Sequence, residues 1–144
     1  MRKQVRRYFF SVALSVMLAV VSAAGANPSI NLRATIPFDF SVNGKTLPAG
    51  TYTIATKSPG LFVIRSMEGS EGMFFLTEST QTENQSDQLV FLKYGDHYFL
   101  TEVCAGDGEF RVPESRKEQK MIRELQSQLA KKASAPVLIH IPAN

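Results

Sequence analysis

The sequence contains no tryptophan and only one cysteine, Cys104, among its 144 residues. An intramolecular disulfide is therefore excluded, and the fold must be held together by the packing of apolar side chains. A single thiol either behaves as a small buried apolar group or cross-links two chains, and the sequence leaves both outcomes open.

The sequence has only two histidines, the residue type that most often serves as a catalytic base or a metal ligand. Nucleophilic catalysis needs a base within hydrogen-bond reach, but Cys104 and His97 would face opposite sides of one strand. His140 has no neighbour at zinc-site spacing, and Asp107-Gly108-Glu109 lacks the later oxygen ligands of a calcium loop. There is no glycine-rich phosphate loop and no pair of carboxylates placed as acid and base. We therefore expect no catalytic residue, metal site or cofactor, and infer that the protein is not an enzyme.

No apolar run reaches the roughly 20 residues that a membrane-spanning helix needs. The longest, Tyr8–Val21, follows four basic residues between Arg2 and Arg7 and precedes the small residues Ala24-Gly25-Ala26. This is the layout of a secretory signal peptide. We predict a signal peptide over residues 1–26, a mature chain that starts at Asn27, and a periplasmic or extracellular location. The cleavage point has no cysteine that could carry a lipid anchor.

Basic residues outnumber acidic ones by 16 to 13 over the whole chain, but four of the basic ones lie in the predicted leader. The mature chain would carry twelve basic and thirteen acidic residues, and this near neutrality does not predict nucleic-acid binding. Residues 27–114 hold six basic and eleven acidic side chains, whereas residues 115–144 hold six and two. The sequence thus predicts an acidic body with a basic C-terminal segment.

The stretch from Gln88 to Val103 predicts a central β-hairpin. Two β-prone segments flank Gly95-Asp96, and glycine at the first central position is typical of a type II′ turn. Large apolar residues fall on both faces, so we expect both faces to be covered. The predicted pairs are Tyr94 with His97, Leu92 with Phe99 and Val90 with Thr101 on one face, and Lys93 with Tyr98, Phe91 with Leu100 and Leu89 with Glu102 on the other.

Strict alternation of apolar and polar residues from Ile30 to Val42 predicts strands with one buried face. Pro37 interrupts the ladder, so we expect two strands that meet there, the second crossing to another sheet. Asn43-Gly44 predicts a type I′ turn that pairs Phe40 with Leu47. Further along, we predict a corner at Leu47–Gly50, strands at Thr51–Thr56, Leu61–Ser66 and Met73–Glu78, a type II turn at Ser58–Leu61, and loops at Ser79–Asp87 and Cys104–Glu109.

The C-terminal segment predicts one helix over residues 115–134. Ser115 and Glu118 form the S-x-x-E pattern of a capping box after Pro113. Ile122, Leu125, Leu129 and Ala133 make an apolar stripe, and the opposite side carries the cations Arg116, Lys117, Lys120, Arg123 and Lys131. These cations are either a solvated face or the contact for an acidic partner or anionic surface. We expect the stripe to dock on the domain itself, followed by an edge strand at Val137–Ile141 between two prolines.

Together these elements predict a mainly β fold, an antiparallel sandwich or small barrel of about seven to eight strands with one C-terminal helix. We divide the chain into the signal peptide (1–26), a β domain (27–114), the amphipathic helix (115–134) and a C-terminal strand or tail (135–144).

Three segments resemble a group of small exported bacterial proteins of unknown function. Phe40–Tyr52 fits the pattern F-x-V-x-G-x-x-L-P-A-G-x-Y, and two further matches follow in order, at Leu89–Leu100 and at Pro113–Glu118. Cys104 stands where that group usually has an aromatic residue. The resemblance implies a bacterial envelope or extracellular protein and no particular activity.

Two functions follow as hypotheses. The first is an exported, non-enzymatic β-module with a binding or structural role, whose partner is an acidic protein or an envelope component. The alternative is a small lipocalin-like carrier barrel that holds an apolar ligand among its phenylalanine side chains. We expect no nucleic-acid partner and no stable membrane insertion after the leader is removed, and homo-oligomerisation stays open.

Overall fold

The computed structural model describes residues 29–81, 86–106, 108–131 and 135–144. The predicted signal peptide and its cleavage site therefore lie outside the described residues, as do the centre of the Ser79–Asp87 loop, Asp107 and the end of the predicted helix. Among the helices that the structure describes, none is long and apolar enough to cross a membrane.

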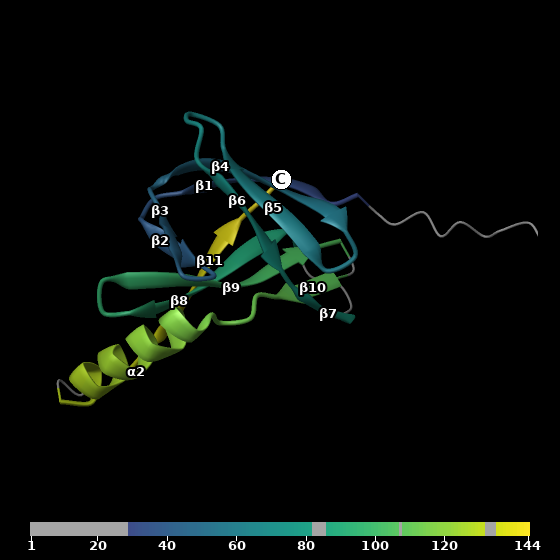
Figure 1. Ribbon diagram of the computed structural model, residues 1–144. Coiled ribbons are helices and arrows are strands. Elements are labelled where there is room, and N and C mark those ends of the chain that lie inside the picture. Colours follow the sequence, from purple (N-terminus) through teal and green to yellow (C-terminus); the bar gives the residue numbers. More distant parts are fainter. Residues whose placement is uncertain (1–28, 82–85, 107, 132–134) are drawn as a thin grey trace, which may run out of the picture.

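The described strands form two sheets, and one helix lies near the C-terminus (Figure 1). The first sheet has the order β1-β4-β5-β6, formed by β1 (Asn31–Ile36), β4 (Gly50–Ser58), β5 (Leu61–Ser66) and β6 (Gly72–Leu76). The second has the order β11-β8-β9-β10-β7, formed by β11 (Val137–Pro142), β8 (Gln88–Tyr94), β9 (His97–Ala105), β10 (Gly108–Arg111) and β7 (Glu78–Gln81). The hairpin of β2 (Phe40–Val42) and β3 (Lys45–Leu47) joins it through β9, and the helix is α2 (Arg116–Lys131).

The predicted fold class is confirmed in its sandwich form. The sheets do not close into a barrel, and the eleven described strands exceed the seven to eight expected. Most of the excess arises where one predicted strand divides between the two sheets or where a polar segment pairs by its backbone.

The long alternating segment divides at Pro37, as predicted. β1 belongs to the first sheet and β2 to the second, and the alternate side chains of both strands are buried. The even-numbered side chains point into the core before and after Pro37. One continuous alternating pattern therefore contributes core residues to both sheets.

The turns follow the predicted backbone chemistry. Asn43 and Gly44 both have positive φ, 48° and 82°, which is the type I′ requirement, and Phe40 pairs with Leu47. In the hairpin between β8 and β9 only Gly95 is positive, at 60°, as a type II′ turn demands. Gly60 has φ 73° where the predicted type II turn places its glycine.

Aromatic side chains fill the space between the sheets. Phe40, Tyr52, Phe62, Phe75 and Phe91 are fully buried. The ring of Phe40 meets Tyr52 and Phe91 edge-on, with centroids 5.3 and 5.4 Å apart, and the Tyr52 hydroxyl donates to the Pro48 carbonyl at 2.7 Å. Each buried ring of this size contributes about 1.5–3 kcal/mol.

The central hairpin has both faces covered, as predicted, but its register changes halfway. Pairs from Tyr94–His97 to Phe91–Leu100 are as expected, whereas Val90 then pairs with Glu102 and Leu89 with Val103. Thr101 is the extra residue of a β-bulge, and its hydroxyl donates to the Val90 carbonyl at 3.0 Å. The predicted pairs Val90–Thr101 and Leu89–Glu102 are therefore wrong. The bulge brings apolar Val103, not a carboxylate, to the core side of β9.

Three expectations for the loops and strand ends are corrected. The predicted strand Met73–Glu78 breaks after Leu76, because β6 lies in the first sheet and β7 in the second. The predicted loop Ser79–Asp87 begins as strand β7, which pairs with β10. Much of the predicted loop Cys104–Glu109 is also strand, because Cys104 lies within β9, which ends at Ala105, and β10 begins at Gly108. These polar segments pair through backbone groups, so they carry no apolar periodicity.

The last strand lies at an edge of the second sheet, as predicted. Among the described strands, β11 pairs with β8 alone, from Val137–Lys93 to Pro142–Gln88. Beyond it, Asn144 and Arg33 exchange backbone hydrogen bonds of 2.7 and 3.0 Å. The C-terminal tail thereby connects β11 of one sheet to β1 of the other.

Candidate functional site

The start of α2 is fixed by reciprocal hydrogen bonds. The Ser115 N–H donates to Glu118 Oε2 at 2.9 Å, and the Glu118 N–H donates to Ser115 Oγ at 3.2 Å. This is the predicted capping box, and it places a buried carboxylate at the positive end of the helix dipole. The helix direction is therefore set at its first turn.

The apolar stripe of α2 docks on the outer face of the central hairpin. Ile122 is buried in a cluster with Tyr94 and Phe99, and half-buried apolar side chains surround them. Gln126 Nε2 also donates to the Tyr94 hydroxyl at 3.3 Å. The predicted docking of the helix on its own domain is thus confirmed for Ile122, Leu125 and Leu129, while Ala133 lies outside the described residues.

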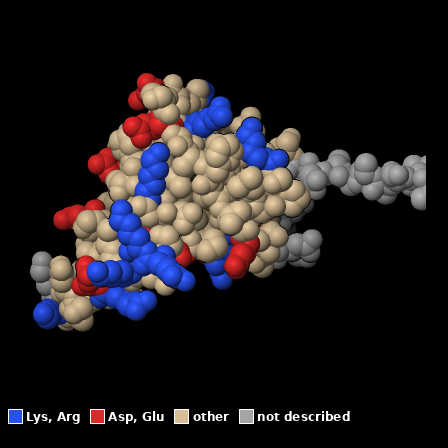
Figure 2. Space-filling view, viewed as in Figure 1, with Lys and Arg blue, Asp and Glu red and all other residues tan. Residues whose placement is uncertain are grey.

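All five predicted partner-binding cations are exposed. They form a basic surface over α2, which Figure 2 shows as the blue side chains at the lower left. We call this set the cation row, and its members are Arg116, Lys117, Lys120, Arg123 and Lys131.

The cation row is not neutralised within the described part of the chain. The ion pairs formed there join Arg111 to Glu102 and Glu109, at 3.7 and 3.4 Å, and neither involves the helix. Lys117 Nζ donates to the Gly44 carbonyl at 3.3 Å, a contact that orients it without cancelling its charge. The row therefore presents several exposed positive charges that face solvent.

The residues considered for catalysis are not brought together. His97 is exposed beside the hairpin turn, and Cys104 is buried seven positions along the same strand, roughly 23 Å away at strand rise. His140 is exposed on the edge strand β11. Among the described residues no group of three metal-binding side chains occurs.

The surroundings of Cys104 make its thiol unreactive. Burial raises the pKa of Cys104 above its ordinary value of 9.0, and the carboxylates of Glu102 and Glu109 raise it further. At neutral pH the side chain is therefore a thiol rather than a thiolate, and it packs as an apolar group.

A second surface was not found by sequence reasoning. Phe74 and Leu76 of β6 point outward with 56% and 65% of their surface exposed. On the neighbouring strand β5, Val63 pairs with Phe74 and Leu61 with Leu76. Figure 2 shows the middle of this side of the molecule largely free of charged groups.

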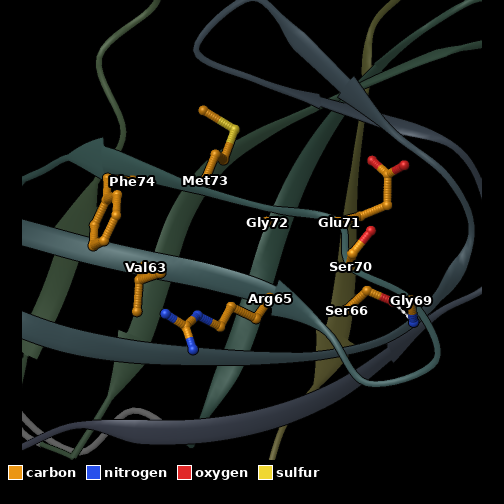
Figure 3. A pocket seen from close by; sticks show the side chains of 9 residues that line it. All are labelled: Val63, Arg65, Ser66, Gly69, Ser70, Glu71, Gly72, Met73 and Phe74. Carbon is orange, nitrogen blue, oxygen red and sulfur yellow. Dashed lines mark hydrogen bonds between the residues drawn. The ribbon is translucent and has the colours of Figure 1, made fainter.

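An open groove of about 490 Å³ adjoins this surface at the β5–β6 hairpin. Figure 3 shows the Phe74 ring beside Val63, with Arg65 further along β5 and Met73 directed to the other side of the strand. The sequence contains an indication of this surface. Met73-Phe74-Phe75-Leu76 is apolar at consecutive positions, so a strand formed by these residues has two apolar faces, and the face that does not pack in the core is either covered by another element or exposed.

No protein-family model, curated protein or solved structure matches the chain.

Proposed function

We propose that the protein is a non-enzymatic binding module that works in the bacterial periplasm or outside the cell and holds an acidic partner through the cation row of α2. The location rests on the leader-like segment before Asn27 and on the resemblance to exported bacterial proteins. The binding role rests on the geometry of the helix.

The observation that carries the proposal is the division of α2 into two separate faces. Its apolar stripe is occupied by Tyr94 and Phe99, whereas its cations face solvent and form no ion pair with a carboxylate among the described residues. The helix has five basic and two acidic side chains, and one of the acids, Glu118, is buried in the capping box. The exposed face is therefore strongly positive.

The negative charge of the β-body restricts where an acidic partner can bind. Residues 27–114 hold eleven acidic and six basic side chains, so an acidic partner is repelled by most of the domain and attracted at α2. Electrostatic attraction of this kind raises the association rate and selects one orientation of the partner.

The chemistry of the partner follows from which face of α2 is still accessible. A helix that lies on a membrane needs a free apolar face with cations beside it, but the stripe of α2 is docked on the domain. An acidic protein surface needs only the cations. We therefore favour an acidic protein over an anionic lipid surface or another anionic envelope component.

The alternative of a lipocalin-like carrier has less support. A carrier needs a closed barrel around a cavity, whereas the two sheets stay separate and Phe40, Tyr52 and Phe91 meet edge-on between them.

Binding to poly-L-glutamate, followed by isothermal titration calorimetry at several salt concentrations, tests the proposal. We expect salt-sensitive binding that the double substitution Lys120→Glu and Arg123→Glu weakens at least about tenfold. The matched control is Lys57→Glu with Arg65→Glu, which reverses two exposed cations on the β-body. Equal weakening by both pairs, or no binding by the unmodified protein, would contradict a role for the helix.

A further inference from the structure

We propose that strand β6 is an interface between two copies of the protein, in which the β6 strands pair antiparallel about a two-fold axis at Phe74. The two four-stranded sheets would then form one continuous sheet. This inference does not depend on the proposed function of α2.

Most of the outward hydrogen-bonding groups along the backbone of β6 have no partner among the described residues. The Glu71 carbonyl accepts from the Ser66 N–H at 2.7 Å, and the Thr77 N–H donates to the Gly60 carbonyl at 2.8 Å. Odd-numbered residues of this segment therefore bond toward β5. Because the direction of these groups alternates along a strand, the N–H and C=O groups of Gly72, Phe74 and Leu76 point away from the sheet.

Among the described edge strands, the others carry features that hinder pairing, whereas β6 has fewer of them. Arg33 of β1 exchanges backbone bonds with Asn144, β11 follows Pro136 and ends with Pro142, β7 begins with Glu78, and β3 begins with Lys45. Charged residues and prolines usually prevent an edge strand from pairing with another chain, and residues Gly72 to Thr77 include neither. Within the described part of the chain, one hydrogen bond reaches this edge, from exposed Lys45 Nζ to the Gly72 carbonyl at 3.3 Å.

The edge is complementary to itself in one register. With Phe74 opposite Phe74 of the second copy, Gly72 lies opposite Leu76, so each of these residues can exchange both backbone bonds once the exposed Lys45 side chain releases the Gly72 carbonyl. Gly72 has no side chain, and the bulky Leu76 of the other copy fills the space beside it. A shift along the strand leaves some of these outward groups unpaired.

The charges also suit this register. β6 itself carries no charge, and Glu71, just before it, lies opposite Thr77 of the second copy, so no carboxylate meets its own counterpart. Like charges directly opposite one another destabilise a strand pair, and here they are absent from every facing position between Glu71 and Thr77. The self-pairing is thus free of electrostatic repulsion at the axis.

The apolar area predicts a weak dimer. Phe74 and Leu76 expose 56% and 65% of their surface, so two copies bury at most roughly 400 Å² through these residues. Stable interfaces bury about 1,200–2,000 Å² in total, and we therefore expect a dissociation constant on the order of 100 µM. α2 lies on the second sheet (Figure 1), so both cation rows stay accessible in the dimer.

Sedimentation equilibrium between about 10 µM and about 1 mM tests self-association. We expect the weight-average mass to rise toward that of a dimer, and Leu76→Lys to weaken association at least about tenfold. Leu138→Lys is the matched control, because Leu138 is 57% exposed and its strand β11 belongs to the second sheet, whereas β6 belongs to the first. A protein that stays monomeric throughout, or equal weakening by both substitutions, would overturn the proposal.

Two further variants test the strand pairing itself. Phe74→Pro removes an outward N–H that the β5 ladder does not use, so it should abolish the dimer while circular dichroism shows an intact fold. In oxidising buffer Phe74→Cys should form a disulfide dimer rapidly, because only Phe74 meets its own copy at about 5.5 Å between Cα atoms, whereas Ser70→Cys should not. A folded Phe74→Pro protein that dimerises normally, or faster cross-linking at Ser70, would overturn this register.

Discussion

Gly44, in the turn between β2 and β3, lies directly against Ser115 at the start of α2. A Cβ atom added to Gly44 would come within 2.9 Å of Ser115 Oγ, and the Gly44 carbonyl accepts a hydrogen bond from Lys117. Two motifs far apart in the sequence, the Asn43-Gly44 turn and the capping box, therefore meet in space. Their contact connects the β-body to the helix that carries the cation row.

We predict that Gly44→Ala lowers the free energy of unfolding by about 2 kcal/mol. The φ of 82° strains any side chain, and the new methyl group also displaces the hydroxyl that caps α2. Gly95→Ala is the matched control, because Gly95 also has positive φ but no atom lies within 4 Å of its added Cβ. Urea unfolding should show a smaller loss for Gly95→Ala, and an equal loss would mean that the contact with Ser115 has no energetic role.

Phe91→Ala should cost about 3–5 kcal/mol, and Leu92→Ala about 1–2 kcal/mol. Phe91 is fully buried between the sheets, whereas Leu92 is half-buried under α2 on the opposite face of β8. Urea unfolding of both variants measures the two faces separately. A neutral Leu92→Ala would show that the helix does not cover this face in solution.

Above about pH 9 the protein should lose stability partly through Cys104. Burial raises the pKa of the folded thiol above 9.0, so the unfolded chain releases its proton first and stability falls as pH rises through the folded pKa. Tyr52, whose pKa is raised above 10.0 mainly by burial, acts in the same direction at higher pH. Unfolding between pH 7 and pH 11 should show a shallower decline for Cys104→Ala, and parallel curves would contradict the role of the thiol.

The protein should not bind anionic vesicles at physiological salt. The apolar stripe of α2 is docked on Tyr94 and Phe99, so the cations alone would have to hold the protein, at about 1 kcal/mol each before screening. Co-sedimentation with phosphatidylserine vesicles measures this directly. Vesicle binding that Lys120→Glu and Arg123→Glu abolish would make the membrane surface the partner.

Export should remove the first 26 residues. Ala24-Gly25-Ala26 has the small side chains that signal peptidase needs, so the mature chain is predicted to begin at Asn27. Intact mass spectrometry of the protein recovered after expression in a bacterial host tests this. Recovery of a chain that keeps Tyr8–Val21 would show that the segment is an anchor or is not processed.

Short-range chemistry was predictable from the sequence. The Asn43-Gly44 and Gly95-Asp96 turns, the capping box of Ser115 and Glu118, and the alternation before Val42 depend on one residue and its close neighbours. The cation row was predictable for the same reason, because helical spacing alone separates those side chains from the apolar stripe.

Longer-range relationships needed the tertiary structure. The bulge at Thr101 depends on which neighbours surround β9, and the polar strands β7 and β10 form because each supplies the other's backbone partners. The sequence likewise predicted a strand containing Phe74 without showing that it ends a sheet. Which edge stays open is decided by how the whole chain packs, so the apolar surface of β6 became visible only in the fold.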